Sequence, residues 1–119
     1  MNDQEKQQFV SDYLDALNKG DVERIVTLYD ENGSCEDPVG RPAVVGTEAI
    51  RTFYQKAIQQ GVSAESTGAA RCAGSAVAAP YLVMVGNMRI ELITVFEFND
   101  KEKITSMKAY WGPENISKI

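Results

Sequence analysis

Histidine is absent from this chain of 119 residues, so the chain lacks the side chain that most often carries protons near neutral pH. The same absence excludes Ser-His and Cys-His nucleophilic sites and leaves a zinc site with almost no support. Acid–base chemistry therefore falls to Asp, Glu, Lys, Tyr or Cys, whose ordinary pKa values lie far from neutrality. Such a group can work at neutral pH in a pocket that changes its environment.

Cysteine is scarce too, because Cys35 and Cys72 are far apart and no CxxC motif is present. The two could form a disulfide, but a cytosolic chain would keep both reduced. No apolar run approaches the length of a membrane-spanning helix. Residues 1–6 also lack the basic start and apolar stretch of a signal peptide. We therefore expect a cytoplasmic protein.

Positive charge is in short supply, since 12 Lys and Arg face 17 Asp and Glu and give a net charge of −5. The basic residues are scattered singly, so neither nucleic acid nor an anionic membrane surface is an expected partner. Hydrophobic residues make up 44% of the chain, which is enough for a packed core. The length suits one domain over residues 1–119.

Apolar residues at helical spacing predict three helices in the first half of the chain. The first covers about residues 3–19 and ends at Gly20, and Asp21 caps the second. The third begins with Thr47 as N-cap and ends at Gly61. The three apolar faces contain Phe9, Val10, Tyr13, Leu14 and Leu17; Val22, Ile25, Val26 and Tyr29; and Ile50, Phe53, Tyr54, Ala57 and Ile58.

Strand patterns fill most of the remaining sequence. Residues 30–33 are predicted to form a turn, and a short strand over residues 34–37 ends where Pro38 removes a backbone donor. Four more strands are predicted at residues 63–72, 76–86, 88–98 and 104–111, with turns at residues 86–87 and 99–103. Pro80 demands a bulge or an edge position in its strand.

Helices followed by an antiparallel meander indicate an α+β fold. The three N-terminal helices would pack in the concavity of a strongly curved, mainly antiparallel sheet, which gives a cone with an open mouth. A cone of this size could leave an apolar cavity in place of a filled core.

Four segments match one family in order, at residues 13–21, 36–40, 46–54 and 107–111. Together with Tyr29 they resemble bacterial delta-5-3-ketosteroid isomerase, in the nuclear-transport-factor-like superfamily, over essentially the whole chain. The segments at 13–21 and 46–54 occur widely in that superfamily. Asp37-Pro38-Val39-Gly40, joined to correctly spaced tyrosines, is more specific.

The resemblance implies an enzyme that moves a proton on a steroid-like ketone, without cofactor or metal, as a homodimer. In that family an aspartate removes a proton from the carbon between a ketone and a double bond and returns it at the far end of that bond. The dienolate intermediate is held by a tyrosine and a protonated aspartic acid.

Asp37 falls on the position of the base in this family. A carboxylate that leaves water for an apolar cavity becomes a stronger base, which agrees with that role. The alternative is a structural one, in which Asp37 caps a turn before Pro38.

Tyr13 falls on the oxyanion donor, and Tyr29 and Tyr54 match tyrosines that support it. All three lie on apolar helical stripes, where a buried phenol needs a hydrogen-bond partner, and chained hydroxyls would strengthen Tyr13 as a donor. The alternative is that each is a core tyrosine bonded to a backbone carbonyl.

The second oxyanion donor is where the chain departs from the family, because Thr94 aligns with the expected aspartic acid. Thr94 shares the apolar face of its strand with Leu92 and Phe96, so we expect its hydroxyl to reach a ligand, as a weaker donor than a carboxyl. The structural alternative is a β-branched residue that fills the strand.

Apolar side chains that could close around a flat ligand complete the predicted site. They are Phe53, Met84, Met107, Ala109 and Trp111. The function that follows is a steroid delta-isomerase acting on a small apolar ketone. Two alternatives remain, a binding protein that has lost the chemistry and a polyketide cyclase-like enzyme on the same fold.

Overall fold

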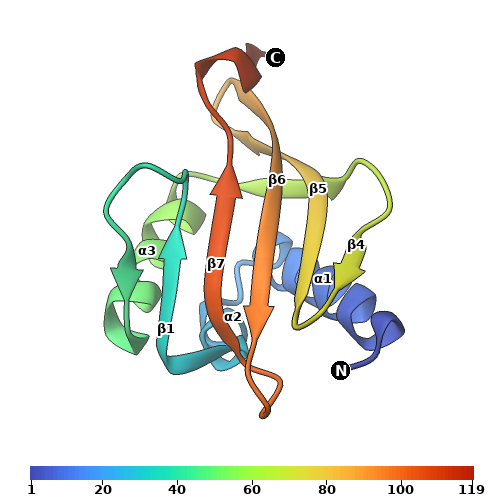
Figure 1. Cartoon of the computed structure of the whole chain (residues 1–119). Helices are drawn as coiled ribbons and strands as arrows, with labels where there is room; N and C mark the ends of the chain where they lie inside the picture. The colour runs from blue at the N-terminus through green and yellow to red at the C-terminus, as the bar shows by residue number, and fades with distance from the viewer.

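The computed structural model describes residues 1–119 and has three helices on one side of a curved eight-stranded sheet (Figure 1). The helices are α1 (Asp3–Asn18), α2 (Val22–Leu28) and α3 (Thr47–Gln59). The predicted α+β architecture, with helices in the concavity of the sheet, is confirmed. No helix has the length and hydropathy that a membrane crossing requires.

The sheet is mainly antiparallel, with one parallel pair. Its strands are β1 (Tyr29–Glu36), β2 (Val44–Val45), β3 (Ser63–Ser66), β4 (Arg71–Ala73), β5 (Ala76–Val85), β6 (Met88–Phe98), β7 (Ile104–Tyr110) and β8 (Ile116–Lys118). They follow the order β2-β1-β7-β6-β5-β3, and β4 pairs with β5 while β8 pairs with β6. Only β1 and β7 run parallel. Cys35 in β1 and Cys72 in β4 are both free thiols.

Two of the three helices begin at a polar N-cap residue, and the N-cap of the third differs from the predicted one. Asn2 caps α1 through the backbone N–H of Glu5, and Asp21 caps α2 through that of Arg24. In α3 the N-cap is Gly46, with φ +93° and no side-chain cap, and Thr47 is the first helical residue. The prediction of Thr47 as N-cap was therefore wrong by one residue, because the glycine supplies the left-handed backbone of the entry turn.

The turn predicted at residues 30–33 was also wrong, because these residues belong to β1. The pairing of β1 with β7 shifts register between Tyr29 and Ser34, so the turn-like composition marks an irregular strand. A side chain at Gly33 would place its Cβ 2.8 Å from the carbonyl oxygen of Ile104, so the close approach requires glycine. Tyr29 starts this strand and is buried.

Pro80 lies in β5 at a position where its missing N–H does not interrupt the pairing with a neighbouring strand. On one side β5 pairs with β6 without interruption. On the other side β3 ends opposite Tyr81 and β4 begins opposite Ala78, so Pro80 lies in the gap between them. The predicted strand over residues 63–72 is thus two short strands, and the local edge expected at Pro80 is present.

The core between α1 and the sheet holds Tyr13 in place. Phe9 of α1 meets Phe96 and Phe98 of β6 edge to face, with ring centroids 5.5 Å and 4.7 Å apart. Burial of each such ring stabilises the fold by about 1.5–3 kcal/mol. Because Tyr13 is one turn beyond Phe9 and its ring also contacts Phe96, this packing fixes its hydroxyl inside the molecule.

The chain after β7 adds elements that the sequence pattern did not predict. A short 3-10 helix, η1 (Pro113–Asn115), leads into β8, which pairs with the first residues of β6. Figure 1 shows this C-terminal segment beyond the end of β7, next to the turn that joins β5 and β6.

Candidate active site

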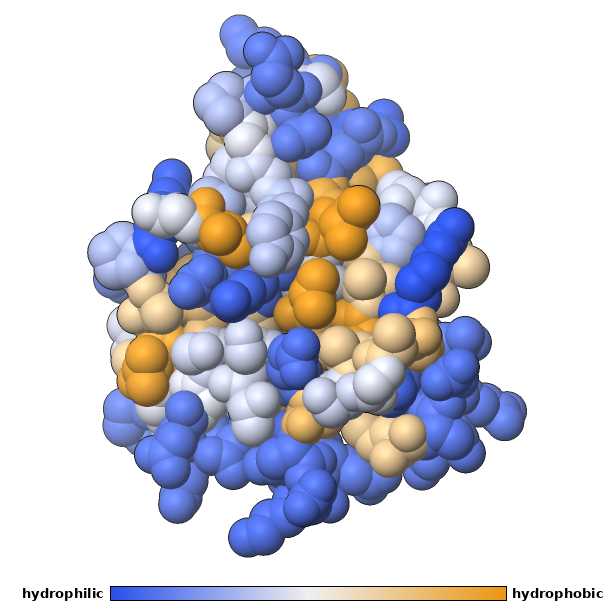
Figure 2. Space-filling view, viewed as in Figure 1, coloured by the Kyte–Doolittle hydropathy of each residue, from blue (hydrophilic) through white to orange (hydrophobic).

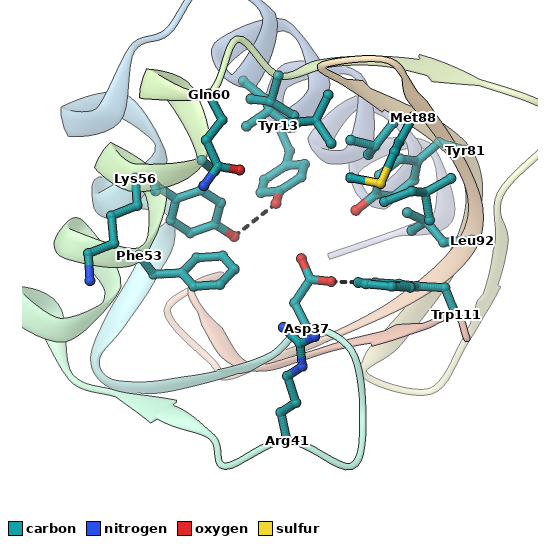
Figure 3. Close-up of a pocket in the computed structure, with 17 residues that line it drawn as sticks. Tyr13, Asp37, Arg41, Phe53, Lys56, Gln60, Tyr81, Met88, Leu92 and Trp111 are labelled. Carbon is teal, nitrogen blue, oxygen red and sulfur yellow. Dashed lines mark hydrogen bonds between the residues drawn. The ribbon is translucent and has the colours of Figure 1, made fainter. Parts of the chain in front are cut away.

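A cavity of about 450 Å³ opens between α1, α3 and the concave face of the sheet (Figure 3). Thirteen of its 17 lining residues are hydrophobic, so a ligand that fills it must be mainly apolar. Asp37 is the only carboxylate in the lining, and Arg41, Lys56 and Gln60 are the other strongly polar residues. No group of three or more His, Cys, Asp or Glu residues is placed to hold a metal ion.

Asp37 follows the end of β1 and points into the cavity (Figure 3). Its Oδ1 accepts a 2.7 Å hydrogen bond from Nε1 of Trp111. Burial raises the pKa of Asp37 above its ordinary value, while the Trp111 hydrogen bond and the charge of Arg41 hold it back. The result is a stronger base than a carboxylate in water.

The turn-capping alternative for Asp37 does not describe this geometry. Its carboxylate accepts a hydrogen bond from the indole of Trp111 and from no backbone N–H. The turn after Asp37 is instead closed through the backbone, where Arg41 N–H donates to the carbonyl of Pro38 at 3.3 Å. The carboxylate is therefore available to a ligand.

Three buried tyrosines form a chain of hydroxyls from three elements. The hydroxyl of Tyr54 on α3 lies 2.8 Å from that of Tyr13 on α1 and 2.6 Å from that of Tyr29 in β1. Burial raises the pKa of each phenol well above its ordinary value, so all three stay protonated at neutral pH. The alternative of backbone carbonyls as partners is not what the structure shows.

Tyr13 and Asp37 face the same space. Both line the cavity, and Figure 3 shows the phenol hydroxyl and the carboxylate pointing toward each other from opposite walls. An apolar molecule between them would meet a base on one side and a neutral hydrogen-bond donor on the other. This arrangement suits the removal of a proton next to a carbonyl.

Thr94 is not in the cavity lining, contrary to the expectation that its hydroxyl reaches a ligand. The residue is 0% exposed, and its Oγ1 donates a 2.8 Å hydrogen bond to the hydroxyl of Tyr81. Tyr81, in β5, does line the cavity. Thr94 is therefore connected to the cavity only through its hydrogen bond to Tyr81.

Among the lining residues that sequence reasoning missed, Tyr81 is the one that carries a hydroxyl. A signal was present, because Tyr81, Val83 and Val85 alternate along one face of β5 and all line the cavity. The hairpin register also places Tyr81 opposite Leu92, two residues from Thr94 on the same face of β6. Arg41, at the cavity mouth, carried no comparable pattern.

Of the five residues predicted to form the apolar lining, two lie in the cavity wall and three do not. Phe53 and Trp111 line the cavity. Met84 does not, because it alternates with Val83 and Val85 and faces the other side of β5. Met107 and Ala109 are each 1% exposed and lie in the packed core, where the sulfur of Met107 is 3.7 Å from the thiol of Cys35.

The sequence and the fold both match known proteins. Residues 10–107 match the model of the SnoaL-like domain family. The chain belongs to the SnoaL-like family. A curated relative, the steroid delta-isomerase of Nocardioides simplex, is 35% identical over 110 residues, which cover 90% of this chain and 89% of that protein.

A solved structure shares the whole fold. It is the epoxide hydrolase/cyclase-like enzyme SalBIII, described for its role in pyran ring formation in polyether salinomycin. The two structures superpose with a TM-score of 0.93, covering 99% of this chain and 98% of that chain, at 28% identity. The predicted family resemblance is confirmed, and the relatives are enzymes that process small molecules.

Proposed function

We propose that this protein is a cofactor-independent steroid delta-isomerase, which converts a 3-oxo-delta-5-steroid into the conjugated 3-oxo-delta-4-steroid within one domain, residues 1–119. The observation that carries the proposal is the placement of Asp37 and Tyr13 on opposite walls of one apolar cavity. The steroid delta-isomerase of Nocardioides simplex, at 35% identity, supports the same reaction class.

The base in this proposal is Asp37. Its carboxylate takes a proton from the carbon between the ketone and the double bond, and the electrons of the broken C–H bond form a new C=C bond while the carbonyl oxygen becomes anionic. The proton then returns from Asp37 to the far end of the dienolate, and the oxyanion becomes a ketone again. A carboxyl with a raised pKa suits both steps, because it takes the proton more readily and holds it until transfer.

Tyr13 donates a hydrogen bond to the developing oxyanion. When Tyr13 donates into the cavity, Tyr54 donates to Tyr13 and Tyr29 to Tyr54, so that the three O–H groups point the same way. Chained donors polarise one another, which strengthens the last bond of the chain. One such donor contributes about 3 kcal/mol to transition-state stabilisation in comparable sites.

The likeness to SalBIII favours a second candidate, a cyclase that opens an epoxide with an internal hydroxyl. That reaction needs a base for the hydroxyl and an acid for the epoxide oxygen at the same time. The lining of this cavity holds one carboxylate, and its phenols have raised pKa values that make them poor acids. The isomerase, which uses a single carboxyl for both proton transfers, fits the residues better.

A non-catalytic binding protein is the third candidate. Against it stands the cost of burying a carboxylate in an apolar cavity, which a pure binding site has no reason to bear. Asp37 makes no salt bridge that would offset this cost.

An absorbance assay with a beta,gamma-unsaturated ketosteroid tests the proposal, because the conjugated product absorbs and the substrate does not. We expect wild type to isomerise the ketone and Asp37→Asn to lose at least about a hundredfold in kcat. Asp100→Asn, at an exposed turn, is the matched control and should keep full activity. Tight steroid binding without turnover would favour the binding protein, and turnover of a hydroxy-epoxide alone would favour the cyclase.

We also propose that two copies associate through the sheet face that turns away from the helices. Ile93 and Tyr110, which are cross-strand partners, are each 50% exposed there. Figure 2 shows hydrophobic side chains gathered in the middle of this face, with polar ones around them. Glu91 and Lys108 are exposed two residues before Ile93 and Tyr110 on the same strands and supply both signs of charge, which suits a self-complementary pairing. The cytoplasmic location expected from the sequence stays a prediction.

A further inference from the structure

Tyr81 offers a second phenol hydroxyl to the cavity. Its hydroxyl oxygen accepts the 2.8 Å hydrogen bond from Thr94 Oγ1, which leaves the hydrogen of Tyr81 to donate on the cavity side, where the hydroxyl of Tyr13 also lies. The residue is 3% exposed, yet its side chain lines the cavity (Figure 3). A buried phenol that accepts one hydrogen bond from behind and lines a ligand cavity is placed to donate to a bound molecule.

The hydroxyl of Tyr81 faces the same space as that of Tyr13. Both side chains line the cavity, and Figure 3 shows both phenols directed into it. Each is also supported from behind, Tyr13 by the hydroxyl of Tyr54 and Tyr81 by that of Thr94. Two phenols arranged in this way can converge on one oxygen atom of a ligand.

We propose that Tyr81 is the second hydrogen-bond donor to the oxygen that Tyr13 binds, and that Thr94 is a positioning residue that acts through Tyr81. The inference rests on the proposed function only in naming that oxygen as the oxyanion of the dienolate. It assigns a catalytic role to a residue for which the family resemblance provides none.

This assignment explains how the chain manages without the aspartic acid that the resemblance leads one to expect at position 94. The Thr94 hydroxyl does not reach the cavity. It is hydrogen-bonded to Tyr81, and the hydroxyl of Tyr81 reaches the cavity in its place. The donor that reaches the ligand is then a phenol, which is more acidic than the threonine hydroxyl behind it. The bond from Thr94 stabilises negative charge on the Tyr81 oxygen and so strengthens Tyr81 as a donor.

The placement also fits the movement of charge during the reaction. The negative charge of Asp37 acts on Tyr81 in the resting protein. When Asp37 takes the proton, that charge disappears and an equal one appears on the ligand oxygen. Phenols already oriented in the cavity need little reorganisation to stabilise the relocated charge.

The first test is kinetic. We expect Tyr81→Phe to lower kcat about a hundredfold, and Thr94→Val to lower it less. The double variant should match Tyr81→Phe, because Thr94 acts only through the phenol. Thr94→Ser, which keeps the hydroxyl, should recover most of the activity. Thr52→Val, the change of Thr94→Val made at an exposed position of α3, is the matched control and should have no effect.

The second test does not depend on turnover. A steroid with a phenolic A ring carries an oxygen that mimics the dienolate when ionised, and its absorbance reports the ionised fraction. In the Asp37→Asn background, which mimics the protonated base of the intermediate, we expect Tyr81→Phe to weaken binding of the phenolate roughly tenfold. Thr94→Val should lower the ionised fraction of the bound phenol by a smaller amount.

The outcomes separate this inference from the proposed function. Unchanged phenolate binding and ionisation in the Tyr81→Phe variant would overturn the role of Tyr81, even if wild type isomerises ketosteroids. A wild type that turns over no ketone would refute the isomerase, and the phenolate measurement would still decide whether Tyr81 donates. Additive losses in the Tyr81→Phe/Thr94→Val variant would show that Thr94 has a separate structural role and would overturn that half of the proposal.

Discussion

Nε1 of Trp111 donates a 2.7 Å hydrogen bond to Oδ1 of Asp37, and this bond links the ends of two neighbouring strands. Trp111 follows β7 and Asp37 follows β1, which are parallel partners in the sheet. Burial raises the pKa of Asp37, and the indole N–H opposes that rise because it stabilises the ionised carboxylate. The guanidinium of Arg41, 5.9 Å from the Trp111 ring, acts in the same direction.

Removal of this hydrogen bond should make Asp37 a stronger base that is ionised only at higher pH. We expect Trp111→Phe to move the acid limb of the kcat/KM profile to higher pH, because the pKa of the free enzyme's base rises when the donor is lost. The measurement is the pH dependence of ketosteroid isomerisation. Phe53→Leu removes aromatic lining without touching the bond, so it should change KM and leave the limb in place. An acid limb that stays put in Trp111→Phe would mean that the indole does not tune Asp37.

The hydroxyl of Tyr54 should matter more than that of Tyr29, because it is the middle member of the chain. Tyr54→Phe removes both hydrogen bonds at once and leaves two buried hydroxyls without their partner. We expect a loss of about 1–3 kcal/mol in the free energy of unfolding and a fall in kcat of roughly tenfold. Tyr29→Phe, the matched variant at the end of the chain, removes one bond and should show smaller losses in both. Denaturant titration and the isomerisation assay measure the two effects, and equal losses in the two variants would contradict a directional chain.

The sequence predicted best those helices and strands whose buried face is defined by the apolar spacing of their own residues. The apolar spacing of α1 and the alternation of β6 each place a buried face without reference to any other segment. The motif around Asp37 and the helical stripe of Tyr13 are local patterns of the same kind, and both residues line the cavity. Their meeting in one cavity follows from the curvature of the sheet.

The errors arise where a neighbour decides the outcome. Residues 30–33 have turn composition, but pairing with β7 makes them an irregular strand. Thr94 faces the core as predicted, yet the length of Tyr81 on the adjacent strand separates it from the cavity. Met107 and Ala109 alternate onto the inner face, but both are buried in the packed core and neither lines the cavity, and only packing tells an inner residue from a lining one.

The outer sheet face gives a prediction about assembly. If a second copy covers Ile93 and Tyr110, then Ile93→Glu should separate the copies, because it buries a charge opposite the same charge across a two-fold axis. Light scattering should report a dimer for wild type and a monomer for the variant. Val45→Glu, which changes a 58% exposed residue on the edge strand β2, is the control and should leave the dimer intact. A monomeric wild type at micromolar concentration would contradict the proposed association.

Asp37 should also limit the stability of the protein, with a pH dependence whose sign is fixed by its environment. In the unfolded chain the carboxyl ionises near its ordinary pKa of about 3.9, whereas burial raises the pKa in the folded protein. Between these two values the folded state binds more protons, so the free energy of unfolding falls as pH rises through that window. Above the window the full penalty of the buried charge persists.

Asp37→Asn removes the charge and keeps an oxygen that can accept the Trp111 hydrogen bond. We therefore expect this variant to be more stable than wild type at pH 7, by a margin that vanishes once both states are protonated at about pH 3. Denaturant titrations at several pH values measure the margin, with Asp100→Asn as the exposed control. A variant that is less stable than wild type at neutral pH would show that the carboxylate is held by interactions stronger than its burial.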